Sequence, residues 1–196
     1  MKKIAITGGI GSGKTTLLEI LKRKGYPVFS CDEIYKEVIR EAEYIEKVAA
    51  LFPDCVQNGV ISKEKLAKIV FSDAEKRAKL NAVAHPMIMQ RLLSSMEKLD
   101  NAIVFAEVPL LFEGGYEDLF DHILVIKRDK EERLKAVEKR DGITIQKAQD
   151  RINAQFDYDT TSANLKFSAC NAIVITNDKT QKDLKKIIAD LIKEIS

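Results

Sequence analysis

The sequence predicts an α/β fold in which helices cover both faces of a parallel β-sheet. Short apolar runs without polar alternation mark the strands, because a strand that is buried on both faces has no solvent-facing side. The segments between these runs have the periodicity of helices, as expected for successive βαβ units. Five strands are expected, at residues 4–6, 27–29, 103–106, 123–126 and 173–175.

The composition is that of an ordered globular protein. With 196 residues, 45% of them hydrophobic and 32% charged, the chain suits one compact domain with a buried core. The net charge of +2 is too small to indicate a nucleic acid or a membrane surface as the partner, and no apolar stretch is long enough to span a bilayer. The three cysteines have neither disulfide nor metal-binding spacing, which predicts reduced thiols in a cytoplasmic protein.

Two helical segments are additions to this sheet. Residues 32–99 have a helical pattern almost throughout, whereas a crossover between parallel strands needs only about a dozen residues. We expect this insertion to cover and bind a substrate. Residues 129–154 form a second, charged stretch that is expected to be a lid over phosphates, and its arginines are Arg133, Arg140 and Arg151. The rest of the single domain 1–196, the predicted nucleotide-binding core, comprises residues 1–31, 100–128 and 155–196.

Helix ends can be placed from local signals. Ser30 is followed three residues later by Glu33, and Ser72 by Glu75, which is the spacing of a capping box. We therefore expect a helix to begin after each serine. Pro86 is expected to bend or end the helix in which it lies, because proline lacks the N–H group that a helix needs.

Residues 8–15 carry the strongest functional signal. They read Gly-Gly-Ile-Gly-Ser-Gly-Lys-Thr, which matches the phosphate-loop pattern, and a strand precedes them while a helix follows. Glycines allow the backbone to turn its N–H groups toward phosphate oxygens. Lys14 should reach the β- and γ-phosphates, and the Thr15 hydroxyl should ligate Mg²⁺. The predicted nucleotide-binding residues of this segment are Gly9, Gly11, Ser12, Gly13, Lys14, Thr15 and Thr16.

Several classes of phosphate-loop protein compete. A GTPase needs an Asn-Lys-x-Asp element late in the chain, and residues 176–179 read Thr-Asn-Asp-Lys instead. A motor ATPase is usually larger. The helical insertion and the arginine-bearing lid favour a small-molecule kinase with the P-loop NTPase fold. A regulator that has lost phosphoryl transfer is the non-enzyme alternative, and the joint presence of Lys14, Thr15, Asp32 and Arg140 speaks against it.

The chain resembles the dephospho-coenzyme A kinases over nearly its whole length. The opening segment 6–15 is similar to theirs, and five further segments follow in the family's order. The phosphate loop alone is generic, whereas the segments at 80–88 and 108–113 are specific to the family. The five further segments read Gly-Tyr-Pro-Val-Phe-Ser-Cys-Asp at 25–32, Leu-Asn-Ala-Val-Ala-His-Pro-Met-Ile at 80–88, Val-Pro-Leu-Leu-Phe-Glu at 108–113, Lys-Arg-Asp-Gly at 139–142 and Ala-Ile-Val-Ile-Thr-Asn at 172–177.

The resemblance implies a reaction and a set of residues. It implies transfer of the γ-phosphoryl group of ATP to the ribose 3′-hydroxyl of dephospho-coenzyme A, the last step of coenzyme A synthesis. Another small-molecule kinase of the same fold, such as a nucleoside monophosphate kinase, is the runner-up. We expect a monomer or weak oligomer whose partners are these two small molecules. By resemblance, the substrate-binding residues are Asp32, His85, Pro109 and Leu110, and the ATP-side residues beyond the loop are Arg140 and Asn177.

Asp32 is the predicted catalytic carboxylate. It follows a strand that we expect beside the phosphate-loop strand, and a carboxylate there can accept the proton of the attacking hydroxyl. The alternative is an acidic residue that only stabilises the first turn of a helix. Ser30 stands where the family has a further aspartate, and we interpret it as a helix cap. For His85, a structural or substrate-contacting role is favoured over that of a general base.

Four positions concern charge near the phosphates. Glu107 ends an apolar strand, where many phosphate-loop enzymes place an acid near the metal, and both a contact through water and a structural salt bridge stay open. Lys14 and Arg140 are the predicted catalytic cations, with Arg140 acting as an arginine finger. Arg133 could compensate for Ala136, where the family has a lid arginine. For both Arg140 and Arg133 the alternative is a solvated helix face.

Residues 155–170 depart most from the family. Their only cation is Lys166, and the family's arginine is missing from this stretch. The residues of this stretch that contact ATP are therefore left open.

Overall fold

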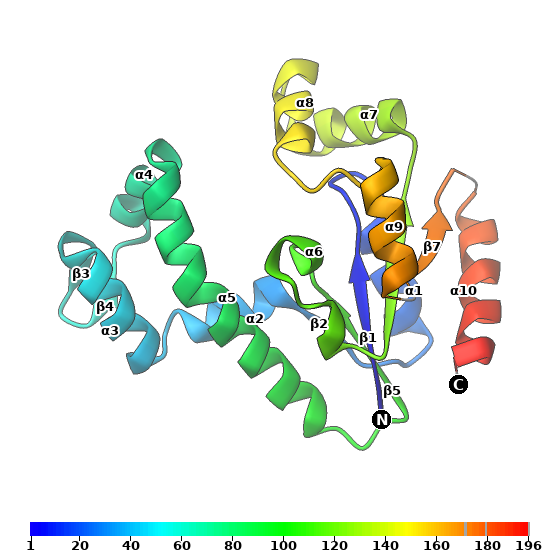
Figure 1. Cartoon of the computed structure of the whole chain (residues 1–196), viewed down its shortest axis with the longest axis horizontal. Helices are drawn as coiled ribbons and strands as arrows, with labels where there is room; N and C mark the ends of the chain where they lie inside the picture. Colours follow the sequence, from blue (N-terminus) through cyan, green and yellow to red (C-terminus); the bar gives the residue numbers. More distant parts are fainter. Residues whose placement is uncertain (171, 179, 196) are drawn as a thin grey trace. The chain divides into compact units, whose positions relative to one another are not determined.

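The computed structural model describes residues 1–170, 172–178 and 180–195 (Figure 1). The chain divides into two compact units. The first comprises Met1–Val28 and Asp100–Ser196, and the second comprises Phe29–Leu99. The second unit contains the predicted insertion of residues 32–99.

Five strands form a parallel sheet in the order β2-β5-β1-β6-β7. All five predicted strands are confirmed, and their bounds are β1 Lys2–Thr7, β2 Val28–Ser30, β5 Ile103–Glu107, β6 His122–Lys127 and β7 Ala172–Thr176. The central strand β1 pairs with β5 on one side and with β6 on the other. The expected adjacency of β2 and β1 is wrong, because β5 lies between them.

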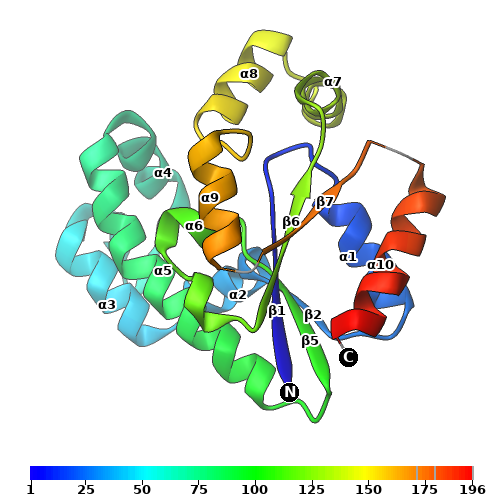
Figure 2. The same ribbon diagram turned by 45° about the vertical axis from the view of Figure 1, so that its right-hand side comes forward.

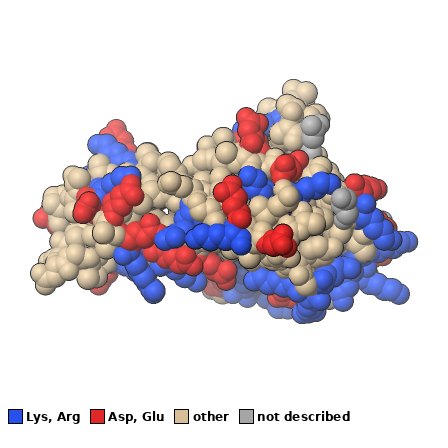
Figure 3. Space-filling model, turned by 90° about the horizontal axis from the view of Figure 1, so that it is seen from below, with Lys and Arg blue, Asp and Glu red and all other residues tan. Residues whose placement is uncertain are grey.

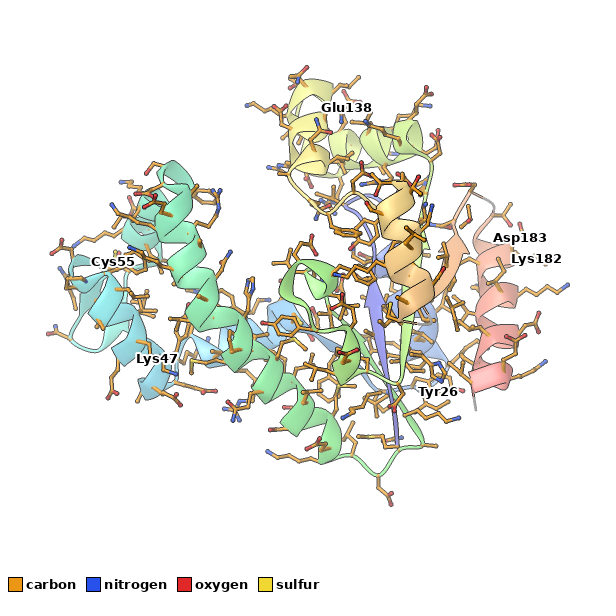
Figure 4. The ribbon with its side chains drawn as sticks, in the orientation of Figure 1. Tyr26, Lys47, Cys55, Glu138, Lys182 and Asp183 are labelled. Atoms are coloured by element: carbon orange, nitrogen blue, oxygen red, sulfur yellow. The ribbon has the colours of Figure 1, made fainter. Side chains whose placement is uncertain are left out.

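Helices cover both faces of this sheet, as predicted. Figure 2 shows α1 (Lys14–Arg23) and α10 (Gln181–Ile195) on one side and α6 (Leu111–Gly114) and α9 (Thr161–Ala169) on the other. Apolar stripes of α1 and α10 pack on the strands, while Lys182 lies on the exposed side of α10 (Figure 4). The core cluster of these elements includes Ile4, Ile6, Leu17, Leu21, Phe105, Leu124, Ile126, Leu184 and Ile188.

The predicted lid consists of α7 (Lys130–Asp141) and α8 (Ile145–Asn153). Figures 1 and 2 show these helices beyond the carboxyl ends of β1 and β6. Asp129 caps α7 by accepting hydrogen bonds from the backbone N–H groups of Glu131 and Glu132. Gly142 ends the helix with a φ angle of 62°, the left-handed conformation that glycine adopts most easily. A 3-10 turn, η2 (Glu117–Leu119), precedes β6.

The second unit is mostly helical, as the sequence predicts. Its helices are α2 (Cys31–Val38), α3 (Ala42–Leu51), α4 (Lys63–Ser72) and α5 (Ala74–Glu97), with a 3-10 turn η1 (Pro53–Cys55). It also contains an antiparallel hairpin of β3 (Val56–Gln57) and β4 (Val60–Ile61), which the sequence analysis did not anticipate.

Two expectations about helix ends in this unit need correction. Helix α5 continues through Pro86, so of the two alternatives for this proline the end of the helix is wrong, and a bend stays a prediction. Asp73, not Ser72, caps α5, since its carboxylate accepts the backbone N–H groups of Glu75 and Lys76 at 3.0 Å each. The Ser30 cap of α2 is confirmed, and its hydroxyl accepts the backbone N–H of Asp32 at 3.3 Å.

Charges of both signs are mixed on the surface that Figure 3 shows, where Lys and Arg side chains lie among Asp and Glu side chains. In the part of the chain that the structure describes, no helix combines the length and the apolar character needed to cross a membrane. With a net charge of only +2, an anionic ligand has to be held by a local arrangement of donors.

Candidate active site

The phosphate loop joins the carboxyl end of β1 to the first turn of α1. Gly8, Gly11 and Gly13 have φ angles of 145°, 78° and 98°, which residues with a side chain rarely adopt. The backbone N–H of Ser12 donates to the Gly9 carbonyl at 3.2 Å and closes the loop on itself. The loop leads directly into the N-terminus of α1, where unpaired backbone N–H groups attract phosphate.

Two side chains of the loop suit a polyphosphate. The Lys14 ammonium donates to the carbonyl of Gly8 at 2.7 Å and to that of Gly9 at 3.2 Å, so its charge lies at the loop. The Ser12 hydroxyl is buried and has no hydrogen-bond partner among the described residues. Because an unpaired buried hydroxyl costs about 1–3 kcal/mol, a phosphate oxygen that accepts from it would be favoured. Both observations fit a bound nucleotide phosphate.

Oxygen donors suited to Mg²⁺ flank the loop. Glu107 is the last residue of β5 and stands in register with Ile6 of β1, next to the start of the loop. Thr15 and Thr16 lie in the first turn of α1. Carboxylate and hydroxyl oxygens are ligands that Mg²⁺ prefers. The residues present therefore fit the metal that the phosphate-loop pattern predicts.

Side chains from three distant segments hold the backbone of the loop. The Ile10 carbonyl accepts a hydrogen bond from Arg133 Nε at 3.1 Å, and the Ile10 N–H donates to Gln155 Oε1 at 2.7 Å. The Asn177 amide donates to the Ser12 carbonyl at 2.9 Å. The resemblance predicts Asn177 as an ATP-side residue. Its position against the loop is what the structure describes, and a contact with ATP stays a prediction.

Tyr158 anchors the same region from the stretch that departs most from the family. Its hydroxyl and that of Thr7 are 2.9 Å apart, and both side chains are buried. Burial raises the pKa of Tyr158 to about 12, so its hydroxyl stays neutral at physiological pH. The ring packs in an aromatic cluster with Phe112, Phe156 and Phe167. This cluster joins α6 and α9 to the segment after the lid.

Lys166, the only cation of residues 155–170, has structural partners. Its ammonium forms an ion pair with Glu117 at 2.6 Å and donates to the Phe112 carbonyl at 3.0 Å. The residues of this stretch that reach the loop are Gln155 and Tyr158. No periodic pattern or motif in the sequence marks either residue, because both contacts are between segments far apart in the chain.

The lid arginines have two different environments. Arg140 and Arg151 both bind the Asp141 carboxylate, at 2.7 and 2.5 Å, and the hydrogen bond from Arg140 is the main cause that lowers the pKa of that carboxyl. The Arg140 side chain is 58% exposed. Arg133 is 6% exposed and lies against the phosphate loop, so the alternative of a solvated helix face is wrong for this residue.

In the second unit, Asp32 lies in the first turn of α2 and borders a pocket of about 850 Å³. The other walls come from α3, α4, the β3–β4 hairpin and α5. Its apolar residues include Ile39, Val60 and Phe71, its cations are Lys36, Arg40 and Lys63, and the hydroxyl of Tyr44 is buried without a hydrogen-bond partner among the described residues. The volume is in the range of sites for small molecules, which are about 300–1,000 Å³.

The other predicted substrate residues lie on two different elements. His85 is half-buried on α5, in the same unit as the pocket. Pro109 and Leu110 form the turn between β5 and α6 in the first unit, where Leu110 is exposed. Contact of any of the three with a substrate stays a prediction.

A phosphate loop between a central parallel strand and a helix, with a lysine at the loop and a helical lid beyond it, defines a P-loop kinase. The chain belongs to the dephospho-CoA kinase family, since the model of the family described as CoaE, dephospho-CoA kinase, matches residues 2–189. Its activity is accordingly that of a dephospho-CoA kinase, the final step of coenzyme A biosynthesis.

Individual relatives agree with this membership. The chain is 36% identical to a dephospho-CoA kinase of Geobacillus kaustophilus over 97% of this chain and 95% of the relative. Among solved structures, dephospho-CoA kinase from Campylobacter jejuni is 30% identical with a TM-score of 0.68, covering 99% of this chain and 96% of that one. Shikimate kinase from Acinetobacter baumannii is 15% identical with a TM-score of 0.56, and its likeness concerns the fold alone.

Proposed function

We propose that the chain transfers the γ-phosphoryl group of ATP to the ribose 3′-hydroxyl of dephospho-coenzyme A. The observation that carries this proposal is the phosphate loop with its lysine and buried serine hydroxyl, in a chain whose family match extends from residue 2 to 189. The backbone N–H groups of Gly9, Gly11 and Gly13 hold the donor phosphates. Lys14 stabilises the negative charge that moves during transfer.

Mg²⁺ would be held by the Thr15 hydroxyl and, through a water, by Glu107. When bound, this ion supplies positive charge that offsets the charge of the β- and γ-phosphate oxygens. Arg140 adds a second positive charge from the lid. Its guanidinium binds Asp141 in the structure, so this role requires the phosphate to replace a carboxylate as its partner.

The pocket of the second unit is assigned to the acceptor. Dephospho-coenzyme A combines a long, partly apolar arm with a diphosphate, and the pocket combines apolar walls with three cations. Asp32 borders this pocket, so its carboxylate would lie beside the bound acceptor and accept the proton of the attacking hydroxyl. His85, Pro109 and Leu110 are proposed as further contacts of the acceptor.

The cations of the pocket give a direct prediction. Replacing Arg40 with methionine should raise KM for dephospho-coenzyme A about fivefold, as expected for one exposed charge pair, while KM for ATP stays within about twofold. Steady-state kinetics with each substrate varied in turn measures both effects. The matched control is Lys47→Met, which removes an exposed cation of α3 outside the pocket lining (Figure 4). An equal change in both KM values, or no change, would count against this assignment.

The proposed reaction is tested by ADP release in a coupled assay with a panel of acceptors. We expect release that saturates with dephospho-coenzyme A and stays at the background rate with AMP. Faster release with AMP than with dephospho-coenzyme A would contradict the proposed acceptor. A cytoplasmic location is proposed with this function, because ATP is supplied there and the spacing of the three cysteines is not that of a disulfide framework. A monomer or weak oligomer stays a prediction.

A further inference from the structure

Gly9 is a glycine for a reason different from that of its neighbours. Its φ angle is not positive, unlike those of Gly8, Gly11 and Gly13, so backbone conformation alone would permit alanine there. A Cβ atom at Gly9 would instead lie 2.2 Å from Arg133 Nη2 and 2.7 Å from Arg133 Cζ. The space that a side chain would need is occupied by the guanidinium group of a lid residue.

Arg133 has little freedom to leave this position. It is 6% exposed, its Nε donates to the Ile10 carbonyl at 3.1 Å, and its Nη1 lies 3.7 Å from the carboxylate of Asp159. Asp159 is itself held by Lys127 at 3.0 Å. A buried guanidinium that loses such partners is strongly disfavoured, so its place against Gly9 is fixed.

The backbone of α7 also packs closely against the loop. A Cβ atom at Gly11 would lie 2.7 Å from the Arg133 carbonyl oxygen and 3.1 Å from Val137 Cγ2. The start of the lid and the tip of the phosphate loop are therefore in direct contact.

Two residues at the borders of the lid converge on one residue of the loop, Ile10. Arg133, near the start of α7, binds the Ile10 carbonyl, and Gln155, just after α8, accepts the Ile10 N–H at 2.7 Å. The directions of the two peptide groups that flank Ile10 are thus set by Arg133 and Gln155. In a phosphate loop the directions of successive peptides decide which N–H groups face the phosphates.

We propose that Arg133 is a positioning residue for ATP. By filling the space at Gly9 and binding the Ile10 carbonyl, it holds the loop in the conformation that receives the donor phosphates. This inference rests on one part of the proposed function, which is that the phosphate loop binds ATP. Among the described residues, the guanidinium contacts the loop backbone and Asp159, so Arg133 acts through the loop and not on the reacting atoms.

A double-mutant cycle tests the proposal. Arg133→Met keeps the apolar stem and removes the donors, and Gly9→Ala displaces the guanidinium while leaving it in the chain. We expect each variant to weaken ATP binding about tenfold, measured as Kd by calorimetry, with KM for dephospho-coenzyme A changed less than about twofold. The double variant should bind ATP no more weakly than either single variant, since both remove one interaction.

The control is Lys135→Met, an exposed cation on the same helix with its side chain 67% exposed, which should bind ATP like the unmodified chain. Independent, multiplying effects in the double variant would overturn the proposal, as would ATP affinity unchanged in Gly9→Ala. If Arg133→Met fails to fold, Arg133→Lys replaces it in the cycle, because lysine keeps the charge and the apolar stem but lacks the guanidinium group that fills the space at Gly9. Failure of the unmodified chain to bind ATP would instead refute the proposed function.

Discussion

Replacing Lys14 with alanine should lower kcat by at least about a hundredfold, the effect of removing one preorganised charge from a transition state. The Lys14 ammonium lies at the loop, bound to the carbonyls of Gly8 and Gly9. Its charge is needed most when the γ-phosphoryl group is in transit, because negative charge on the transferring oxygens is then redistributed. We therefore expect a smaller change in the Kd for ATP than in kcat.

Single-turnover kinetics and ATP titration on the same preparation separate these two effects. Lys22→Ala is the matched control, because Lys22 lies in the last turn of α1 and is exposed. Near-normal turnover of Lys14→Ala would show that residues 8–15 are not the donor site.

Replacing Asp32 with asparagine should also lower kcat by at least about a hundredfold, the lower end for loss of a general base. The amide keeps the shape of the side chain, and the Ser30 cap is retained because Ser30 accepts the backbone N–H of residue 32. It cannot accept a proton at neutral pH, so the acceptor hydroxyl would lose its base. KM for both substrates should change little, since an uncharged group of the same size still lines the pocket.

The competing view makes Asp32 only an acidic residue in the first turn of α2, and Glu33 provides the matched control because it lies in the same turn. On that view Asp32→Asn and Glu33→Gln each lose about 0.3–1 kcal/mol of stability and keep nearly normal rates. If Asp32 is the catalytic base, only Asp32→Asn loses turnover. Thermal unfolding and kcat measured on both variants decide, and normal turnover with a lowered Tm in Asp32→Asn would refute the catalytic role.

The features of the fold that depend on local sequence could be predicted. The phosphate loop needs glycines at positive φ between a strand and a helix, and residues 8–15 contain all of these signals together. The strands could be found because each is buried on both faces and is therefore apolar throughout. The order of the strands depends on packing between distant segments, and nothing in residues 27–29 shows that β5, rather than β1, is the neighbour of β2.

Two features of the second unit differ from what the sequence predicts although local signals were present. The signal for the hairpin was missed, and the signal of Pro86 was outweighed by packing. Asn58 and Gly59 have φ angles of 50° and 73°, which is the two-residue hairpin turn that this pair of residues favours. The helical pattern around them hid the two short strands. Pro86 lies inside α5 because packing of this long helix against α2, α3 and α4 outweighs one missing hydrogen bond.

The environment of the site was harder to predict than its residues. The positions of three site residues relative to the loop could be predicted from the sequence. They are Lys14 and Ser12 in the loop and Glu107 beside it. Arg133, Gln155 and Tyr158 come from segments more than 100 residues farther along the chain, and their contacts with the loop depend on how α7, α8 and the following turn pack. Of the lid arginines, Arg140 matched a motif, whereas Arg133 is the one that the structure places against the loop.

Analysis of the reaction product tests the central claim most directly. The chain would be incubated with ATP, Mg²⁺ and an equimolar mixture of dephospho-coenzyme A and AMP, and the products examined by mass spectrometry and NMR. The account predicts that dephospho-coenzyme A gains one phosphoryl group, attached to the ribose 3′-oxygen, while AMP is unchanged. A phosphoryl group on another oxygen, or transfer to AMP with dephospho-coenzyme A left intact, would contradict it.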